Sequence, residues 1–157
     1  MTDRSKIINE QTTFAATDTI CFFSPEGGAL HKMQEKEWTP VIEWINDLGC
    51  DFKVSEGFDV PPLTERTKSF LQKRLDAFPD EELEAFCAVS GGCRSVILAL
   101  AAADGFLTAE QAFDRAILEE RYHTLFWQDD EDAKISREGR KESVLRAAEK
   151  LKGCKNG

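Results

Sequence analysis

The pattern of apolar and polar residues predicts a chain that is mostly helical. Apolar side chains recur every three or four residues along most of the sequence, which is the spacing of amphipathic helices. No internal repeat accompanies this pattern. The expected helices cover residues 5–16, 29–38, 40–48, 64–78, 80–105, 108–127 and 135–153.

Two short segments near the N-terminus have the composition of strands instead. They are DTICFF at 18–23 and CDFKVSEGF at 50–58, in which β-branched and aromatic residues are frequent. Pro61 and Pro62 end the second segment. The predicted fold class is therefore mainly α, a helical domain with a small two-stranded β element near its N-terminus.

Local signals predict where several helices begin or bend. Thr39 followed by Pro40 predicts that a helix restarts or kinks at this point. Thr108 and Gln111 have the spacing of a capping box, which starts a helix. The two glycines at 91–92 predict either a kink or the close approach of another element.

A carboxylate interrupts the apolar stripe of the segment 108–127. At about 100° per residue, Glu120 falls in the middle of a stripe made by Phe113, Ala116, Ile117, Thr124 and Trp127. Burying a lone carboxylate is costly unless it is paired. Glu120 must therefore meet a cation of this protein, a partner that supplies one, or water in a groove. The candidate internal cations are Arg94, Arg115 and Arg121.

The length and composition of the chain fit one domain, or one domain with an extended arm. The chain has 157 residues, of which 41% are hydrophobic and 31% charged, as in ordinary globular proteins. Its net charge of −9 argues against a nucleic-acid partner, whose phosphates it would repel. The apolar run SVILALAAA is shorter than the roughly 20 residues that span a bilayer, so we expect no membrane insertion.

Cysteine and histidine usage gives little support for a metal site. The five cysteines form no C-x-x-C pair, and only His31 and His123 could assist them. Cys87 or Cys93 could form a nucleophile–base pair with a histidine, but buried structural thiols are the commoner case. We therefore expect no metal and no cofactor, and a reducing compartment.

Four segments, taken in order, carry a resemblance to a known family. They are DTICFF at 18–23, EWTPVIEW at 37–44, SVILALAAADGFLTAEQA at 95–112 and LEERYHTLFW at 118–127. Together they resemble the helical C-terminal domain of the F(1)-ATPase assembly chaperone of mitochondria and alphaproteobacteria. That family binds the free alpha subunit of ATP synthase and prevents its aggregation before it pairs with beta subunits. The resemblance implies the same function here.

The resemblance also implies a role for Glu120. The family has an essential acidic residue in a Leu-acid-Glu-acid segment, and this residue maps onto Glu120, which would then meet the client. The chain departs from the family pattern at Phe22, Thr39, Arg121 and Gln128, where Tyr, Asp, an acidic residue and Gly are usual. The expected partner-binding residues are Glu120, Glu119, Trp127, Ile117, Phe113 and Thr124.

Residues and resemblance together predict a non-enzymatic chaperone that acts as a monomer. The family's β-rich N-terminal domain has no counterpart in the sequence, so we expect an N-terminal arm or helix at 1–17 and a helical chaperone-like domain at 18–157. The expected location is the bacterial cytoplasm, with the mitochondrial matrix as the alternative. Two other functions stay open: a small helical enzyme or ligand-binding protein that uses Glu120 with a nearby Cys or His, and a general helical protein-interaction module.

Overall fold

The chain folds into a mainly helical structure, as the apolar pattern predicts. The computed structural model describes residues 2–57 and 59–156, with side chains described for 3–57 and 59–151. Within these residues there are two 3-10 turns, η1 (Ala15–Thr17) and η2 (Thr19–Cys21), and eight α-helices. The helices are α1 (Thr2–Phe14), α2 (Ala29–Asp47), α3 (Glu65–Asp76), α4 (Asp80–Cys93), α5 (Val96–Ala103), α6 (Ala109–Ala116), α7 (Leu118–Thr124) and α8 (Glu131–Asn156).

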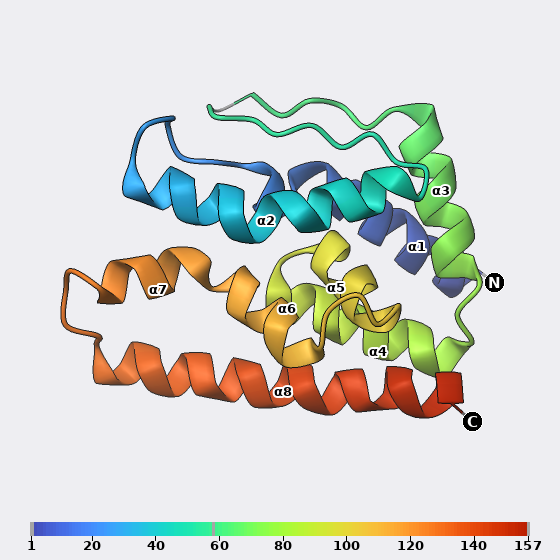
Figure 1. The fold of residues 1–157 in the computed structure, drawn as a ribbon. Coiled ribbons are helices and arrows are strands. Elements are labelled where there is room, and N and C mark those ends of the chain that lie inside the picture. The colour runs from blue at the N-terminus through green and yellow to red at the C-terminus, as the bar shows by residue number, and fades with distance from the viewer. Residues whose placement is uncertain (1, 58, 157) are drawn as a thin grey trace.

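Helix α5 forms the centre of the fold. Its sequence, VILALAAA, is apolar on all sides, and every one of its residues is buried. Figure 1 shows α5 and α6 between α2 on one side and the long α8 on the other, while α4 packs along α8. Helix α1 packs on α3 and adds Ile8 to the same core. No helix within the described ranges is both long and apolar enough to cross a membrane.

Helix α2 continues through Pro40 without restarting, so the expected division into two helices is wrong. A proline inside a helix removes one backbone hydrogen bond and is normally unfavourable. Here the side chains around it are anchored, because Trp38, Val41 and Ile45 are all buried in the core. Tertiary packing therefore holds the backbone helical on both sides of the proline.

Among the described residues 2–57 and 59–156 the expected small β element does not form, and this part of the prediction is wrong. In place of the first strand, Thr19–Cys21 forms the turn η2, because the Asp18 side chain accepts a hydrogen bond from the Ile20 amide and caps it. In the described part of the two segments, the strand pairing is an isolated parallel bridge between Phe22 and Ser55. The last residue of the second expected strand, Phe58, lies outside the described residues.

Asp18 joins the N-terminal turn to the central helix. Its carboxylate is fully buried and accepts hydrogen bonds from the Ser95 hydroxyl (2.6 Å) and the Ile97 amide (2.9 Å), at the start of α5. Ser95 in turn caps α5 by accepting from the Leu98 amide. Burial raises the pKa of Asp18 from 3.8 to about 6, while these hydrogen bonds act in the opposite direction.

The segment expected to be one helix from 80 to 105 is two helices, α4 and α5, and the glycines at 91–92 lie just before the break. Helix α4 ends at Cys93, where Arg94 adopts a left-handed conformation with φ of 54°. A Cβ atom added to Gly92 would lie 2.3 Å from Cγ2 of Val144 on α8, whereas one added to Gly91 would meet nothing within 4 Å. Gly92 therefore allows α8 to pack directly on α4.

The segment expected to be one helix from 108 to 127 is two helices. The capping box at Thr108 is confirmed and starts α6. The backbone then leaves helical geometry at Ile117, with φ of −100° and ψ of 20°, before α7 begins. At this break the Trp38 indole of α2 donates a hydrogen bond of 2.8 Å to the Arg115 carbonyl. The break rotates α7 relative to α6, so a single stripe no longer describes both.

Candidate functional site

Glu120 lies at the interface of α7 and α8 and is held by two arginines of its own chain. Its Oε1 accepts from Arg140 Nη2 at 3.0 Å, and its Oε2 lies 3.4 Å from Arg137 Nη1. The Glu120 side chain nevertheless remains 40% exposed. Of the explanations left open by the sequence, an internal cation is therefore present, but it does not enclose the carboxylate.

The internal cations differ from those expected. Arg94, Arg115 and Arg121 are the arginines considered from the sequence alone, but none of them pairs with Glu120 among the ion pairs of the described side chains. The partners come from α8, 17 and 20 residues further along the chain. Sequence spacing within one helix could not identify them, because the contact depends on how α8 folds back.

Arg121 points to the other neighbour of α7. It makes a two-pronged ion pair with Glu37 of α2, with distances of 2.7 and 3.1 Å, and also donates to the Asp114 carbonyl. The hydrogen bonds to Glu37 raise the pKa of Arg121 above its ordinary value. Such paired, planar contacts fix geometry as well as charge. Helix α7 is thus tied to α2 and to α8 through consecutive residues.

The arginines of α8 connect the site to the core. Arg137 also pairs with Asp129, and this hydrogen bond is the largest cause of the raised pKa of Arg137. The Arg140 guanidinium lies 5.8 Å from the centre of the Phe113 ring. Its Nε is buried and has no hydrogen-bond partner among the described side chains. Arg140 therefore lies between the buried Phe113 ring and the partly exposed Glu120 carboxylate.

A shallow, open pocket of about 200 Å³ adjoins Glu120. Both α7 and the first turns of α8 contribute to it. Trp127, at one side, is 62% exposed. The lining residues are Glu120, His123, Thr124, Trp127, Gln128, Asp129, Ala133 and Arg137.

The structure brings half of the expected partner-binding residues together. Glu120, Thr124 and Trp127 line this one pocket. Phe113 and Ile117 are buried and belong to the core, so they support the site from beneath instead of forming its surface. Glu119 is exposed.

The sequence carries no local signal that Arg137 and Arg140 belong to this site. Leu125 and Phe126 are also absent from the expected site residues, although they are 68% and 60% exposed. For these two, the signal was available: LFW places three large apolar residues immediately before the polar QDDEDAK.

Cys87 and Cys93 do not form a reactive centre with this pocket. Cys93 is buried, and its burial raises its pKa to about 12, while burial also raises the pKa of Cys87. A thiolate, the reactive form of cysteine, is therefore disfavoured at both positions. Neither thiol lines the Glu120 pocket. Within the part of the chain that the structure describes, no group of three or more His, Cys, Asp or Glu is placed to hold a metal ion.

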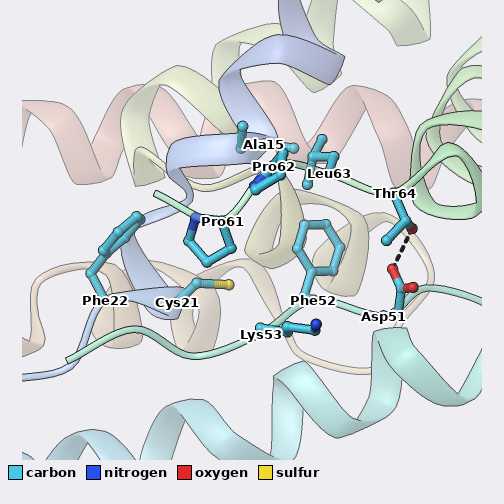
Figure 2. A pocket seen from close by; sticks show the side chains of 11 residues that line it. Ala15, Cys21, Phe22, Asp51, Phe52, Lys53, Pro61, Pro62, Leu63 and Thr64 are labelled. Atoms are coloured by element: carbon cyan, nitrogen blue, oxygen red, sulfur yellow. Dashed lines mark hydrogen bonds between the residues drawn. The ribbon is translucent and has the colours of Figure 1, made fainter. Parts of the chain in front are cut away.

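A second pocket, of about 210 Å³, lies between the N-terminal turns and residues 51–53 and 61–64 (Figure 2). Its wall is mainly apolar and includes Phe22, Phe52 and Leu63. The carboxylate at its edge, Asp51, accepts hydrogen bonds from Thr64 (2.6 Å) and Thr67, which lower its pKa. Asp51 thus anchors residues 51–53 to the start of α3, and its Oδ1 is engaged by both hydroxyl groups.

Comparison with known proteins agrees with the resemblance. The family model described as ATP12 chaperone protein matches residues 1–46. The fold matches the crystal structure of Atp12 from Paracoccus denitrificans with a TM-score of 0.87 and 19% identity. This match covers 93% of the chain and 63% of the Paracoccus protein. A mutant of that protein matches with a TM-score of 0.88, also at 19% identity, over 94% of the chain and 63% of the mutant's.

A third structure has a higher sequence identity. It is the Atu1473 protein of Agrobacterium tumefaciens, proposed to be a chaperone, which is 26% identical with a TM-score of 0.86. The match covers 96% of this chain and 57% of that one. The chain therefore spans roughly three fifths of the length of these structures. In sequence over residues 1–46, and in fold over more than nine-tenths of its length, the chain is similar to the ATP12 chaperones.

Proposed function

We propose that this chain acts as a chaperone in the assembly of the ATP synthase catalytic head. In this proposal it binds the free alpha subunit, prevents its aggregation, and releases it to the beta subunits. The similarity to ATP12 chaperones supports the general role. The similar proteins of known structure are bacterial, which favours the bacterial cytoplasm over the mitochondrial matrix as its location.

One observation carries the proposed site. Glu120 has two cations of its own chain, yet its carboxylate remains 40% exposed beside the exposed ring of Trp127. A carboxylate held in place by arginines but open to solvent can accept a further donor from another protein without rearrangement. The proposed contact surface consists of Glu120, Thr124 and Trp127, with Glu119 at its exposed edge.

The first test is co-purification of the chain with the ATP synthase alpha subunit of the same organism. We expect a complex, and suppression of light scattering when denatured alpha subunit is diluted into the chaperone. Recovery of a different protein in place of the alpha subunit would support a general interaction module and contradict the proposal.

The second test separates an external role of Glu120 from an internal one. Glu120→Gln and Arg140→Gln each remove the same ion pair, but only the first removes the carboxylate that the client would meet. We expect Glu120→Gln to weaken alpha-subunit binding by about tenfold or more, as for other interface charges that lose their partner. Arg140→Gln should leave binding within about twofold.

Two controls accompany this pair. Glu149→Gln removes an exposed carboxylate of α8 outside the pocket and should bind as the wild type does. Circular dichroism and urea unfolding establish that each variant is folded. If Glu120→Gln and Arg140→Gln lose the same amount of alpha-subunit binding, the ion pair only stabilises α7. Glu120 would then not belong to the contact surface.

A further inference from the structure

Three consecutive large apolar side chains are exposed where α7 ends. Leu125, Phe126 and Trp127 are 68%, 60% and 62% exposed. We call these three residues the apolar tip. Scattered exposed apolar residues are ordinary on protein surfaces, but a contiguous group is typical of a contact site. Among the side chains that the structure describes, these are the large exposed apolar residues that follow one another directly in the sequence.

The side chains of the tip are held in place by ring contacts. The Phe126 ring packs edge-on against Tyr122 at 5.1 Å, and the Trp127 ring lies 4.9 Å from His123, between ring centres. Phe126 and Trp127 also contact each other at 5.9 Å. Rings that are already ordered lose little conformational entropy when a partner binds, which favours affinity.

The backbone that carries the tip is also fixed. The amides of Phe126 and Trp127 donate to the His123 carbonyl, at 3.1 and 3.0 Å, which extends the last turn of α7. Helix α7 itself is tied to α2 by Arg121 and to α8 by Glu120. Figure 1 shows α7 and the start of α8 extending together at one end of the molecule, so the tip lies away from the central helices.

Acidic residues follow the tip directly. The sequence after Gln128 is Asp129, Asp130, Glu131 and Asp132. Asp129 is paired with Arg137, whereas Asp130, Glu131 and Asp132 are exposed at the start of α8. The arginines nearest to this surface are themselves engaged, because Arg137 and Arg140 hold Asp129 and Glu120. The surroundings of the tip therefore carry an excess of negative charge.

This charge selects among possible occupants. A second copy of the chain would bring a second acidic segment and a further net charge of −9, so like charges would oppose self-association through the tip. Nucleic acid and anionic lipid surfaces are disfavoured for the same reason. A protein segment with lysine or arginine beside an apolar side chain has the complementary chemistry. Its cation can meet the carboxylates or the face of Trp127.

We propose, resting on the proposed function, that the apolar tip binds a segment of the client protein in which apolar side chains are flanked by Lys or Arg. The apolar side chains pack on Leu125, Phe126 and Trp127. The basic ones lie toward Asp130, Glu131 and Asp132. The tip thus adds a recognition element next to Glu120 and defines which class of client sequence the chain accepts.

The first experiment uses peptides as probes. One labelled peptide has two leucines and a phenylalanine flanked by lysines, and a second has glutamates in place of the lysines. By fluorescence anisotropy we expect the lysine peptide to bind about tenfold or more tightly than the glutamate peptide at low salt, with the difference shrinking as salt is added. Equal binding of the two peptides would overturn the proposal.

Variants of the full chain locate the peptide. Leu125→Ser and Trp127→Ala should each weaken binding of the lysine peptide by about tenfold or more. The triple variant Asp130→Asn, Glu131→Gln, Asp132→Asn should lose the preference for lysine. Ile135→Ser is the matched control, because Ile135 is an apolar residue of α8 that is 60% exposed but does not belong to the apolar tip. If Ile135→Ser weakens lysine-peptide binding as much as Trp127→Ala does, the peptide does not bind specifically at the tip and the proposal is overturned.

The alpha subunit distinguishes this proposal from the proposed function. If it binds the wild type and the two tip variants equally well, the chaperone function stands and the tip proposal fails. If the lysine peptide binds at the tip but the alpha subunit does not bind at all, the tip proposal stands for another basic client and the proposed function fails. If the tip variants bind neither the lysine peptide nor the alpha subunit, the result supports both the tip proposal and the proposed function.

Discussion

Glu120 and Arg121 are neighbours in α7, but they form ion pairs with two different helices. Glu120 contacts Arg137 and Arg140 of α8, whereas Arg121 contacts Glu37 of α2. Adjacent residues on a helix point about 100° apart, which is what allows one short helix to be fastened on two sides. A helix of seven residues is too short to be stable alone, so these contacts and the buried Leu118 hold it in place.

The Arg121–Glu37 pair should contribute measurably to stability. Glu37 is only 19% exposed and the contact is two-pronged. The coupling free energy of the pair should therefore be about 1 kcal/mol, near the upper end of the range for surface ion pairs. A double-mutant cycle with Arg121→Gln and Glu37→Gln, followed by urea unfolding, measures the coupling. The exposed pair of Arg146 and Glu142 serves as the comparison and should give a coupling near zero. Equal couplings for the two pairs would contradict this prediction.

Gly92→Ala should destabilise the protein, and Gly91→Ala should not. The new methyl group at 92 would overlap Cγ2 of Val144 and force α8 away from α4, at a cost of about 1–3 kcal/mol. At 91 the methyl group meets open space, and alanine is favoured over glycine in a helix by about 0.5–1 kcal/mol. Chemical denaturation of both variants gives the comparison. A Gly92→Ala protein as stable as Gly91→Ala would show that α8 can shift freely.

Asp18 should make stability depend on pH. Its pKa is raised from 3.8 to about 6 by burial, so the folded state holds the proton more tightly than the unfolded state. The stabilisation from this proton is fully present below about pH 4 and is lost as the pH rises through about 6. The stability of the wild type relative to Asp18→Asn should therefore fall by about 2 kcal/mol between about pH 4 and about pH 7.

The Asp18→Asn variant is the reference in this experiment because its side chain does not titrate. Taking the difference between the two proteins cancels the titration of the other acidic residues. Urea unfolding at several pH values supplies the free energies. A difference that grows with pH would mean that the hydrogen bonds from Ser95 and Ile97 outweigh the effect of burial.

The described thiols should differ in their reaction with a disulfide reagent. Cys21, Cys50 and Cys93 are buried, and Cys87 is partly exposed in the groove between α1 and α4. In a Cys154→Ser background we expect one slow reaction at Cys87 in the native protein. The other three should react only when the protein unfolds. Native labelling of Cys93 before Cys87, detected by mass spectrometry, would contradict the packing around α5.

Much of the helical architecture follows from local sequence. The capping box at Thr108, the helix start expected at residue 64 and the two glycines at 91–92 each correspond to a feature that the structure contains. These signals act over a few residues and are visible in the sequence alone. The fold class, mainly α, could therefore be predicted correctly.

Other features depend on contacts between distant parts of the chain. The segment 18–23 has strand composition, yet the Asp18 carboxylate, buried against the start of α5, caps a 3-10 turn there. Pro40 lies within a continuous helix because its neighbours are buried in the core. The partners of Glu120 lie on α8. In each case contacts between distant residues determine the local structure or the ion pair. These contacts cannot be inferred from a short stretch of neighbouring residues.

The contact of Gly92 with α8 has a consequence for a surface that it does not touch. Helix α8 is continuous from Val144 back to Arg137, a separation of about 10 Å along its axis. It behaves as a stiff rod over that length, so displacing it at Val144 also moves the guanidinium groups that hold Glu120. A larger residue at position 92 should therefore also change how Arg137 and Arg140 hold Glu120, and with it the anionic charge that this end of α7 presents to its surroundings.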